Sequence, residues 1–310
     1  MKKTVLLISL TAVIAAAAGC SKTVVRDTDT ENGGLVPVVL GAKMSAAEAT
    51  ASKSPITASS RFTATVGGWV SRTGSADYTG TPSWTAVTSE IAGNADRQPV
   101  TLTEQPYYEP DDADKTYMKA WYPEGTPSGG SVSFENTDGS VDAMMSREIV
   151  GSRKDKDGKN LVFDHLTAQL IFDVVGGEGL AAGTTITSIK VLEAGLPTGF
   201  DLAAGTATFT PAADGGLTVP GIDGTQVIGS TAAQAGLPVM VEPLEDNTFT
   251  LEVTTSGNQD DPFVVPVTVD DTALQAGTAY TITLTFIQQR VDITATVTEW
   301  KSGTGSTTII

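Results

Sequence analysis

Short runs of alternating apolar and polar residues, separated by Gly, Pro, Asn and Asp, recur through the second half of the chain. Alternation with a period of two is typical of a β-strand with one buried face. Many such runs at a spacing of roughly 8–14 residues, with no convincing long helix between them, indicate antiparallel sandwiches. The expected strands are 168–175, 185–192, 206–210, 237–241, 248–254, 263–269, 280–286 and 291–300. The sequence therefore predicts an all-β fold.

The first half carries weaker strand signals and more Trp and Tyr. A first strand is expected at 35–44, where Pro37 favours an edge position. The charged run 154–160 separates this half from the Thr- and Val-rich half after it. Two domains are also the natural expectation at this length. We predict a signal peptide at 1–19, an acidic tether at 20–34, an N-terminal β-sandwich domain at 35–160 and a C-terminal β-sandwich domain at 161–310.

Cys20, the only cysteine, follows Ala17-Ala18-Gly19 and a charged, then apolar, N-terminal segment. A charged start, a short apolar core and small residues before a cleavage site are typical of a secretory signal peptide. A cysteine directly after that site is the bacterial lipobox pattern, which predicts cleavage before Cys20 and acylation of its sulfur and amino group. The alternatives are an ordinary secreted protein or a short membrane anchor.

Charge and residue usage exclude several function classes. The full chain has a net charge of −17, and loss of residues 1–19 leaves 17 basic against 36 acidic side chains. Nucleic-acid binding needs clusters of Lys and Arg, so this balance argues against it. His165 is the only histidine, which excludes Cys/His zinc sites and Ser-His-Asp nucleophiles. The counts of histidine and cysteine do not exclude a calcium site or a carboxylate-pair glycosidase, but no local signature indicates either. We expect no enzyme activity, no cofactor and no metal.

Two acidic segments and one set of aromatic residues have a structural and a functional interpretation. The run 155–160 superficially resembles a calcium loop, yet Asp157-Gly158 is also a favoured hairpin turn. The acidic segment 111–114 is expected to cap or solvate a loop. Trp69, Trp84 and Tyr107 are candidates for a sugar-binding platform, although aromatics at alternating strand positions are more often core residues. His165 is interpreted as a structural residue, hydrogen-bonded at a domain edge.

Several of these segments occur together in one known family. The most specific is 161–174, in which Phe163 and His165 form a Phe-x-His pattern that runs into an apolar strand. The others are the lipobox with its tether, Tyr-Met-Lys-Ala-Trp-Tyr-Pro at 117–123, the segment 274–284 and the ending 291–303. In this order they resemble the Mfa-like fimbrillin family, the type V pilus subunits of gut and oral Gram-negative anaerobes. Residues 176–236 carry little that is recognisable.

The resemblance implies two tandem transthyretin-like β-sandwich domains after a lipoprotein signal peptide. It implies a structural and adhesive subunit of a type V pilus (fimbria), displayed at the cell surface from the outer membrane. In the family, a trypsin-like protease removes the first strand, and a strand from another fimbrillin subunit fills the groove by β-complementation. The expected partners are these subunits, the protease, the outer membrane through the lipid, and a host or bacterial surface ligand.

Carried onto this sequence, the resemblance indicates specific residues. Arg61 lies between the first strand and the next and is the favoured cleavage site, with Lys53 as the alternative; a cut at Arg26 would open no groove. Cleavage would remove a strand that carries Leu35, Val36, Val38 and Leu40.

Ile309 and Ile310 are candidate plugs of a C-terminal donor strand, and Thr272 lies in a short O-glycosylation-like sequence, Asp-Thr-Ala. Stalk, tip and anchor roles stay open. The alternative function is a non-polymerising outer-membrane lipoprotein that binds glycans, which an exposed aromatic platform would favour.

Overall fold

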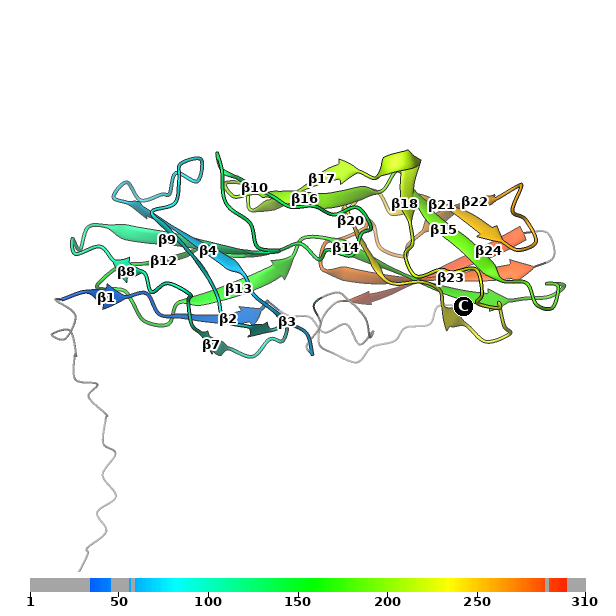
Figure 1. Ribbon diagram of the computed structural model, residues 1–310, viewed down its shortest axis with the longest axis horizontal. Helices are drawn as coiled ribbons and strands as arrows, with labels where there is room; N and C mark the ends of the chain where they lie inside the picture. Colours follow the sequence, from blue (N-terminus) through cyan, green and yellow to red (C-terminus); the bar gives the residue numbers. More distant parts are fainter. Residues whose placement is uncertain (1–33, 46–55, 57–58, 288–289, 300–310) are drawn as a thin grey trace, which may run out of the picture. The chain divides into compact units, whose positions relative to one another are not determined.

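The structure is a computed structural model that describes residues 34–45, 56, 59–287 and 290–299 (Figure 1). By its contacts, the chain from Leu35 onward forms one compact unit. Cys20, Lys53, Ile309 and Ile310 lie outside the described residues, so the predictions made for them stay predictions. Among the described residues, no helix has both the length and the apolar character that crossing a bilayer requires.

The described part of the chain is all-β, as predicted, with one 3-10 turn at Ala213–Gly215 (η1) and no α-helix. The strands up to His165 are β1 (Val36–Pro37), β2 (Leu40–Met44), β3 (Arg61–Phe62), β4 (Thr65–Ser71), β5 (Trp84–Val87), β6 (Ile91–Ala92), β7 (Gln98–Val100), β8 (Tyr107–Tyr108), β9 (Lys115–Tyr122), β10 (Ser131–Ser133), β11 (Met144–Ser146), β12 (Ile149–Gly151) and β13 (Asn160–His165).

The later strands are β14 (Ala168–Gly176), β15 (Ile186–Leu192), β16 (Gly195–Asp201), β17 (Thr206–Pro211), β18 (Gly216–Thr218), β19 (Ala233–Gln234), β20 (Val239–Val241), β21 (Thr248–Thr255), β22 (Phe263–Thr268), β23 (Thr278–Ile287) and β24 (Arg290–Glu299). All eight strands expected in the second half are present, with bounds that differ by one or two residues. Three strands were missed, namely β16, β18 and β19. The longest of them, β16, has the sequence Gly-Leu-Pro-Thr-Gly-Phe-Asp, which contains Gly and Pro, and both residues are depleted in strands.

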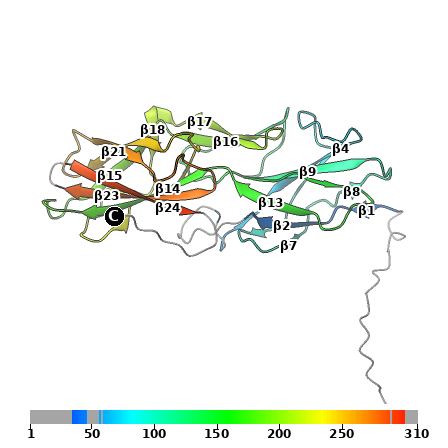
Figure 2. The same ribbon diagram turned by 180° about the vertical axis from the view of Figure 1, so that it is seen from behind.

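The sheet of the first half has the order β5-β4-β9-β11-β13-β2-β7, with β12 also paired to β9. Within it, β2 lies between β13, to which it is parallel, and β7, to which it is antiparallel. Figure 2 shows these three strands side by side from behind. The expected single strand at 35–44 is therefore two strands, and the edge position predicted from Pro37 holds for β1, which pairs only with β8.

The predicted division after residue 160 needs one correction. Strand β13 starts at Asn160 and pairs with β11 and β2, and its Leu161 and Phe163 are fully buried in the core of the first half. The charged run 154–160 is a turn that leads into this strand and not a linker between domains. Strand β13 as a whole, up to His165, therefore belongs to the sheet of the first half.

The second half buries one core between two sheets, β19-β14-β23-β24 with β20, and β18-β15-β21-β22. Alternate residues of β14, β15, β21 and β23 contribute to a single apolar cluster that includes Phe172, Ile189, Leu251 and Tyr280. Two sheets that share their inner faces in this way are the arrangement expected of alternating strands. The first strand of this half, β14, is parallel to β23 over eight residue pairs.

A third, smaller cluster joins residues from both halves. Strand β10 pairs with β16, and Phe200 and Leu202 pack against Trp69, Tyr78 and Trp121. At this place the buried Lys119 donates from Nζ to the Leu202 carbonyl at 2.6 Å and lies 4.2 Å from the centre of the Tyr78 ring. Burial lowers the pKa of Lys119.

Candidate functional site

Every second residue from Val36 to Met44 points into the core. The inward side chains are Val36, Val38, Leu40, Ala42 and Met44, each no more than 2% exposed. They pack in the core of the first half against side chains that include Phe62, Met118 and Phe163. Leu35, predicted as a strand residue, precedes β1 and is 46% exposed, so it is not an inward residue. Ala42 and Met44 are inward residues that the sequence prediction did not single out.

The backbone of this segment is paired along most of its length. Val36 and Pro37 pair with Tyr108 and Tyr107, and Val38 N donates to the Pro106 carbonyl at 2.9 Å. Further on, β2 bonds to two neighbours at once, because β7 and β13 flank it. Its departure would leave two strand edges unpaired and an apolar groove between them, which is the geometry that β-augmentation uses.

Tyr108 is the aromatic neighbour of this segment. Its ring is buried, and its hydroxyl has no hydrogen-bond partner within the described structure. Burial, followed by the charges of Asp155 and Asp157, raises its pKa to about 12.

Arg61 has an exposed side chain but a paired backbone. It opens β3, in which Arg61 and Phe62 pair with Ala92 and Ile91, and Gly93 N donates to the Ser60 carbonyl at 3.0 Å. Phe62, directly after the predicted cleavage site, is buried, and its ring lies 5.3 Å from that of Phe163. Cleavage after Arg61 therefore requires the two-residue β3–β6 pairing to open first.

His165 is a buried structural residue, as its sequence context indicated. Its Nδ1 lies 2.9 Å from Asp142 Oδ2, and both side chains are almost fully buried. The same carboxylate accepts from Ile56 N at 3.2 Å, which connects it to the chain leading to Arg61. Sequence reasoning missed Asp142, because its partner is 23 residues away and no local pattern relates the two.

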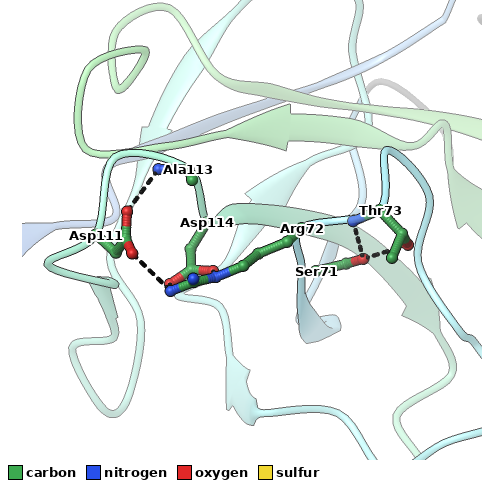
Figure 3. Close-up of polar contacts among 6 residues, drawn as sticks. All are labelled: Ser71, Arg72, Thr73, Asp111, Ala113 and Asp114. Atoms are coloured by element: carbon green, nitrogen blue, oxygen red, sulfur yellow. Dashed lines mark hydrogen bonds and ion pairs between the residues drawn. The ribbon is translucent and has the colours of Figure 1, made fainter.

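The acidic segment 111–114 binds basic side chains and holds loops together (Figure 3). Arg72 donates from Nη2 to Asp111 Oδ2 at 2.7 Å and from the same atom to Asp114 Oδ2 at 3.1 Å. Its Nε also donates to Asp114, and this hydrogen bond holds the pKa of Asp114 below its usual range. Lys154 pairs with Asp112. These contacts explain the segment without a ligand.

The calcium-like segment 155–160 is a turn. Ser152 and Asp155 exchange backbone hydrogen bonds of 3.1 Å, and Gly158 has a φ of +69°, which favours glycine. Lys159 pairs with Asp155 at 2.8 Å. Among the described residues, no group of three or more His, Cys, Asp or Glu side chains is placed to hold a metal ion.

The aromatic residues proposed for a sugar-binding platform lie in separate places. Trp69 is buried, with its ring 4.8 Å from that of Tyr78. Trp84 pairs with Gly68 across β4 and β5 and packs, partly buried, against the core of the first half. Tyr107 is partly buried in β8. Trp121, in β9, is fully buried.

Thr272 is exposed in the turn before β23. Its two neighbours are held by Tyr280, whose hydroxyl lies 3.2 Å from the Ala273 carbonyl and 3.3 Å from Asp271 Oδ2. The hydroxyl also accepts from Gln275 N at 2.8 Å. Exposure is what a modified threonine requires, and the modification itself stays a prediction.

Known proteins share this chain's family profile and its fold. The sequence profile of the fimbrillin-like family matches residues 57–300. Among solved structures, the chain is similar to a candidate cell adhesion protein from Bacteroides uniformis, with a TM-score of 0.55 and 19% identity over 87% of this chain and 99% of that one. A second, from Bacteroides ovatus, gives a TM-score of 0.52 and 14% identity over 87% and 99% of the two chains.

A fimbrial assembly protein from Parabacteroides distasonis gives a TM-score of 0.50 and 13% identity over 86% of this chain and 97% of that one. At these identities the likeness concerns the fold alone. No curated protein matches the sequence. Because the family profile covers most of the chain, from the residues before β3 to the end of β24, this protein belongs to the fimbrillin-like family of structural fimbrial proteins, which are not enzymes.

Proposed function

We propose that this chain is a structural and adhesive subunit of a type V pilus, exported as a lipoprotein and assembled by protease-triggered strand exchange. The observation that carries the proposal is the segment from Val36 to Met44. It fills the core of the first half with five inward side chains. Lys53 lies between this segment and the next strand, and Arg61 is the first residue of that strand. A segment that is essential to the core and yet separable by one cut is what strand exchange requires.

The proposed architecture is two tandem transthyretin-like β-sandwich domains, divided after His165. Support comes from two large apolar clusters, one formed by residues up to Phe163 and one by residues from Ala168 onward. Each cluster contains its own first strand, β2 or β14, parallel to a strand that comes late in that half.

The proposed sequence of events begins with acylation at Cys20 and display at the outer membrane surface. A trypsin-like protease then cuts after Arg61, and the first strand leaves. Full burial of each large apolar side chain contributes roughly 1.5–3 kcal/mol. An empty groove that has lost several of them therefore strongly favours a new occupant.

We propose a strand from a second copy or a related fimbrillin as that occupant. Ile309 and Ile310 are the candidate plugs of the donated tail, and Thr272 is the candidate glycosylation site. The assembled subunit would lie at the cell surface in the fimbrium, where it would meet a host or bacterial ligand. The fimbrial assembly protein from Parabacteroides distasonis, which shares the fold, supports this context.

Limited trypsin treatment of the chain from Ser21 to Ile310 tests the proposal. The expected result is an early cut that gives a new N-terminus at Phe62, seen by intact mass and N-terminal sequencing. Oligomers should then accumulate on size-exclusion chromatography. Arg61→Gln should abolish both the cut and the oligomers.

Arg26→Gln is the matched control, because Arg26 precedes the first strand and its loss should leave cleavage at Arg61 and oligomer formation unchanged. A cut chain that stays a stable monomer with the first strand released would contradict polymerisation. That result would favour the alternative function, a non-polymerising outer-membrane lipoprotein that binds glycans.

A further inference from the structure

A side-chain hydrogen bond crosses the outer face of β2 at Gly41. Arg97 directly precedes β7, and Asn160 is the first residue of β13, so the two residues flank β2 from opposite sides. In register, Gly41 lies beside Asn160 on one neighbour and beside Pro99 on the other. Arg97 Nε donates to Asn160 Oδ1. We call this pair the clasp.

The clasp occupies the place where any other residue at position 41 would carry its side chain. A Cβ on Gly41 would overlap Asn160 Oδ1, and it would lie 2.9 Å from Arg97 Nε and 3.3 Å from the Gln98 carbonyl. The φ of Gly41 is not in the positive range, so ordinary residues suit its backbone conformation. Any other residue at position 41 therefore needs Asn160 and Arg97 to shift.

Neighbouring hydrogen bonds restrict the movements of Asn160 and Gln98 that would make room for a side chain at position 41. The Asn160 amide is held at its other end, where Nδ2 donates to the Gly158 carbonyl at 2.8 Å. The Gln98 side chain is bonded to both backbone groups of Ala92, which fixes the carbonyl that faces Gly41. On the β13 side, Gly41 N donates to the Lys159 carbonyl at 2.8 Å.

We propose that the Arg97–Asn160 clasp is a specificity and register filter for strand exchange. It admits a strand from a second copy of this chain only when that strand places a glycine at the position of Gly41. The inference rests on the proposed function, since a filter matters only if another strand enters this groove.

The filter adds to the apolar pockets that receive the inward side chains. Alternate apolar residues fit a groove of this kind in several registers two residues apart, because the side-chain period is two. A single outward glycine removes that ambiguity. Gly303 and Gly305 give the C-terminal tail residues of the required kind.

The first test uses the intact chain and does not depend on exchange. Gly41→Ala should lower Tm by about 3–8 °C, as expected for overpacking in a chain of this size. In an Asn160→Ala background the same substitution should lower Tm by less than half as much, because Asn160 Oδ1 is gone, Arg97 has lost its acceptor there, and the 3.3 Å contact with the Gln98 carbonyl remains. Val39→Ala, an outward position on the same segment, is the control and should have no effect in either background. Equal effects of Gly41→Ala in both backgrounds would overturn the clasp.

The second test measures entry of a strand. A fluorescent peptide of residues 35–45 is added to the trypsin-cut chain, and its incorporation is followed by size-exclusion chromatography. The Gly41→Ala peptide should bind at least about tenfold more weakly than the natural one. The cut Asn160→Ala chain should bind both peptides within about twofold of each other.

The outcomes separate the filter from the function. Equal binding of both peptides to the natural cut chain would overturn the filter and leave strand exchange standing. If neither peptide enters the cut chain, strand exchange at this groove is wrong and the filter is overturned with it.

Discussion

The two halves of the chain place their first strands in the same way. In the first half, β2 is parallel to β13, the last strand of that half, and in the second half β14 is parallel to β23. Parallel neighbours need a long connection, so each half closes its sheet only when its two ends come together. The first strand therefore completes the core in both halves.

The difference lies in the connection that leaves each first strand. The residues from 45 to 61 contain Lys53 and Arg61, whereas the connection from β14 to β15, residues 177–185, contains no Lys or Arg. Strand β14 also makes eight parallel residue pairs with β23, against four between β2 and β13. The connection after β2 thus contains residues of the kind that a trypsin-like protease recognises, whereas the connection after β14 contains none. Four predictions examine this contrast.

The largest effect is expected from substitutions of buried side chains in the two first strands, β2 and β14. Phe172→Ala in β14 should lower the free energy of unfolding by about 3–5 kcal/mol, and Leu40→Ala in β2 should lower it by about 2–5 kcal/mol. Both side chains are buried, and their removal leaves a cavity. Urea unfolding of the uncut chain measures both. Val39→Ala, with a side chain 62% exposed, is the control and should stay within about 0.5 kcal/mol. If Leu40→Ala costs no more than the control, β2 does not complete the first core.

A second effect concerns the end of the first half. Asp142→Ala should destabilise the chain by about 2–3 kcal/mol, because it removes the buried carboxylate that accepts from Ile56 N and lies 2.9 Å from His165 Nδ1. Hydrogen exchange should show the loss of protection first at Ile56 and His165. Asp138→Ala is the control, since that carboxylate accepts from Ser140 and from backbone within its own loop. Equal costs would show that the buried pair adds nothing to the stability of this junction.

A smaller effect on stability is expected from two buried tyrosines, one in each half. Tyr280→Phe in β23 should cost about 1–2 kcal/mol, because Gln275 N loses its acceptor. Tyr108→Phe in β8 should change stability by less than about 0.5 kcal/mol at neutral pH, because its hydroxyl has no partner in the described structure. Thermal unfolding compares the two. A Tyr108→Phe cost as large as that of Tyr280→Phe would reveal a missing partner at the first strand.

The smallest effect is a pH dependence. The folded pKa of Tyr108, about 12, lies above its ordinary value near 10, so the folded state keeps the proton longer than the unfolded state. Its contribution to stability is therefore complete below pH 10 and is lost as pH rises from 10 towards 12. Tyr108→Phe should make the alkaline decline shallower over this range. An unchanged slope would show that the tyrosine is hydrated in the folded state.

Much of the fold could be predicted because the second half has a regular pattern. Strands such as β21 and β23 alternate Thr with Val, Ile or Leu, and a period of two is readable in one strand at a time. The charged run at 154–160 was misread as a boundary for the same reason, since a local pattern does not show which sheet the next strand joins. Strand β16 was missed because its Gly and Pro residues hide the alternation.

Some features of the candidate site could likewise be predicted from the sequence, and others could not. The alternation of Val36, Val38 and Leu40, the basic residue at Arg61 and the structural role of His165 could be read from neighbouring residues. Three other features could not. They are the insertion of β2 between β7 and β13, the pairing that covers the backbone of Arg61, and the Arg97–Asn160 contact above Gly41. Each joins residues that lie far apart in the sequence.

Local periodicity therefore established that this chain is all-β and which side chains of a strand point inward, because both depend on residues next to one another. Which strands become neighbours and which side chains lie over Gly41 were settled by folding. Those features depend on contacts between segments far apart in the chain, and loop closure and packing select such contacts without leaving a local pattern.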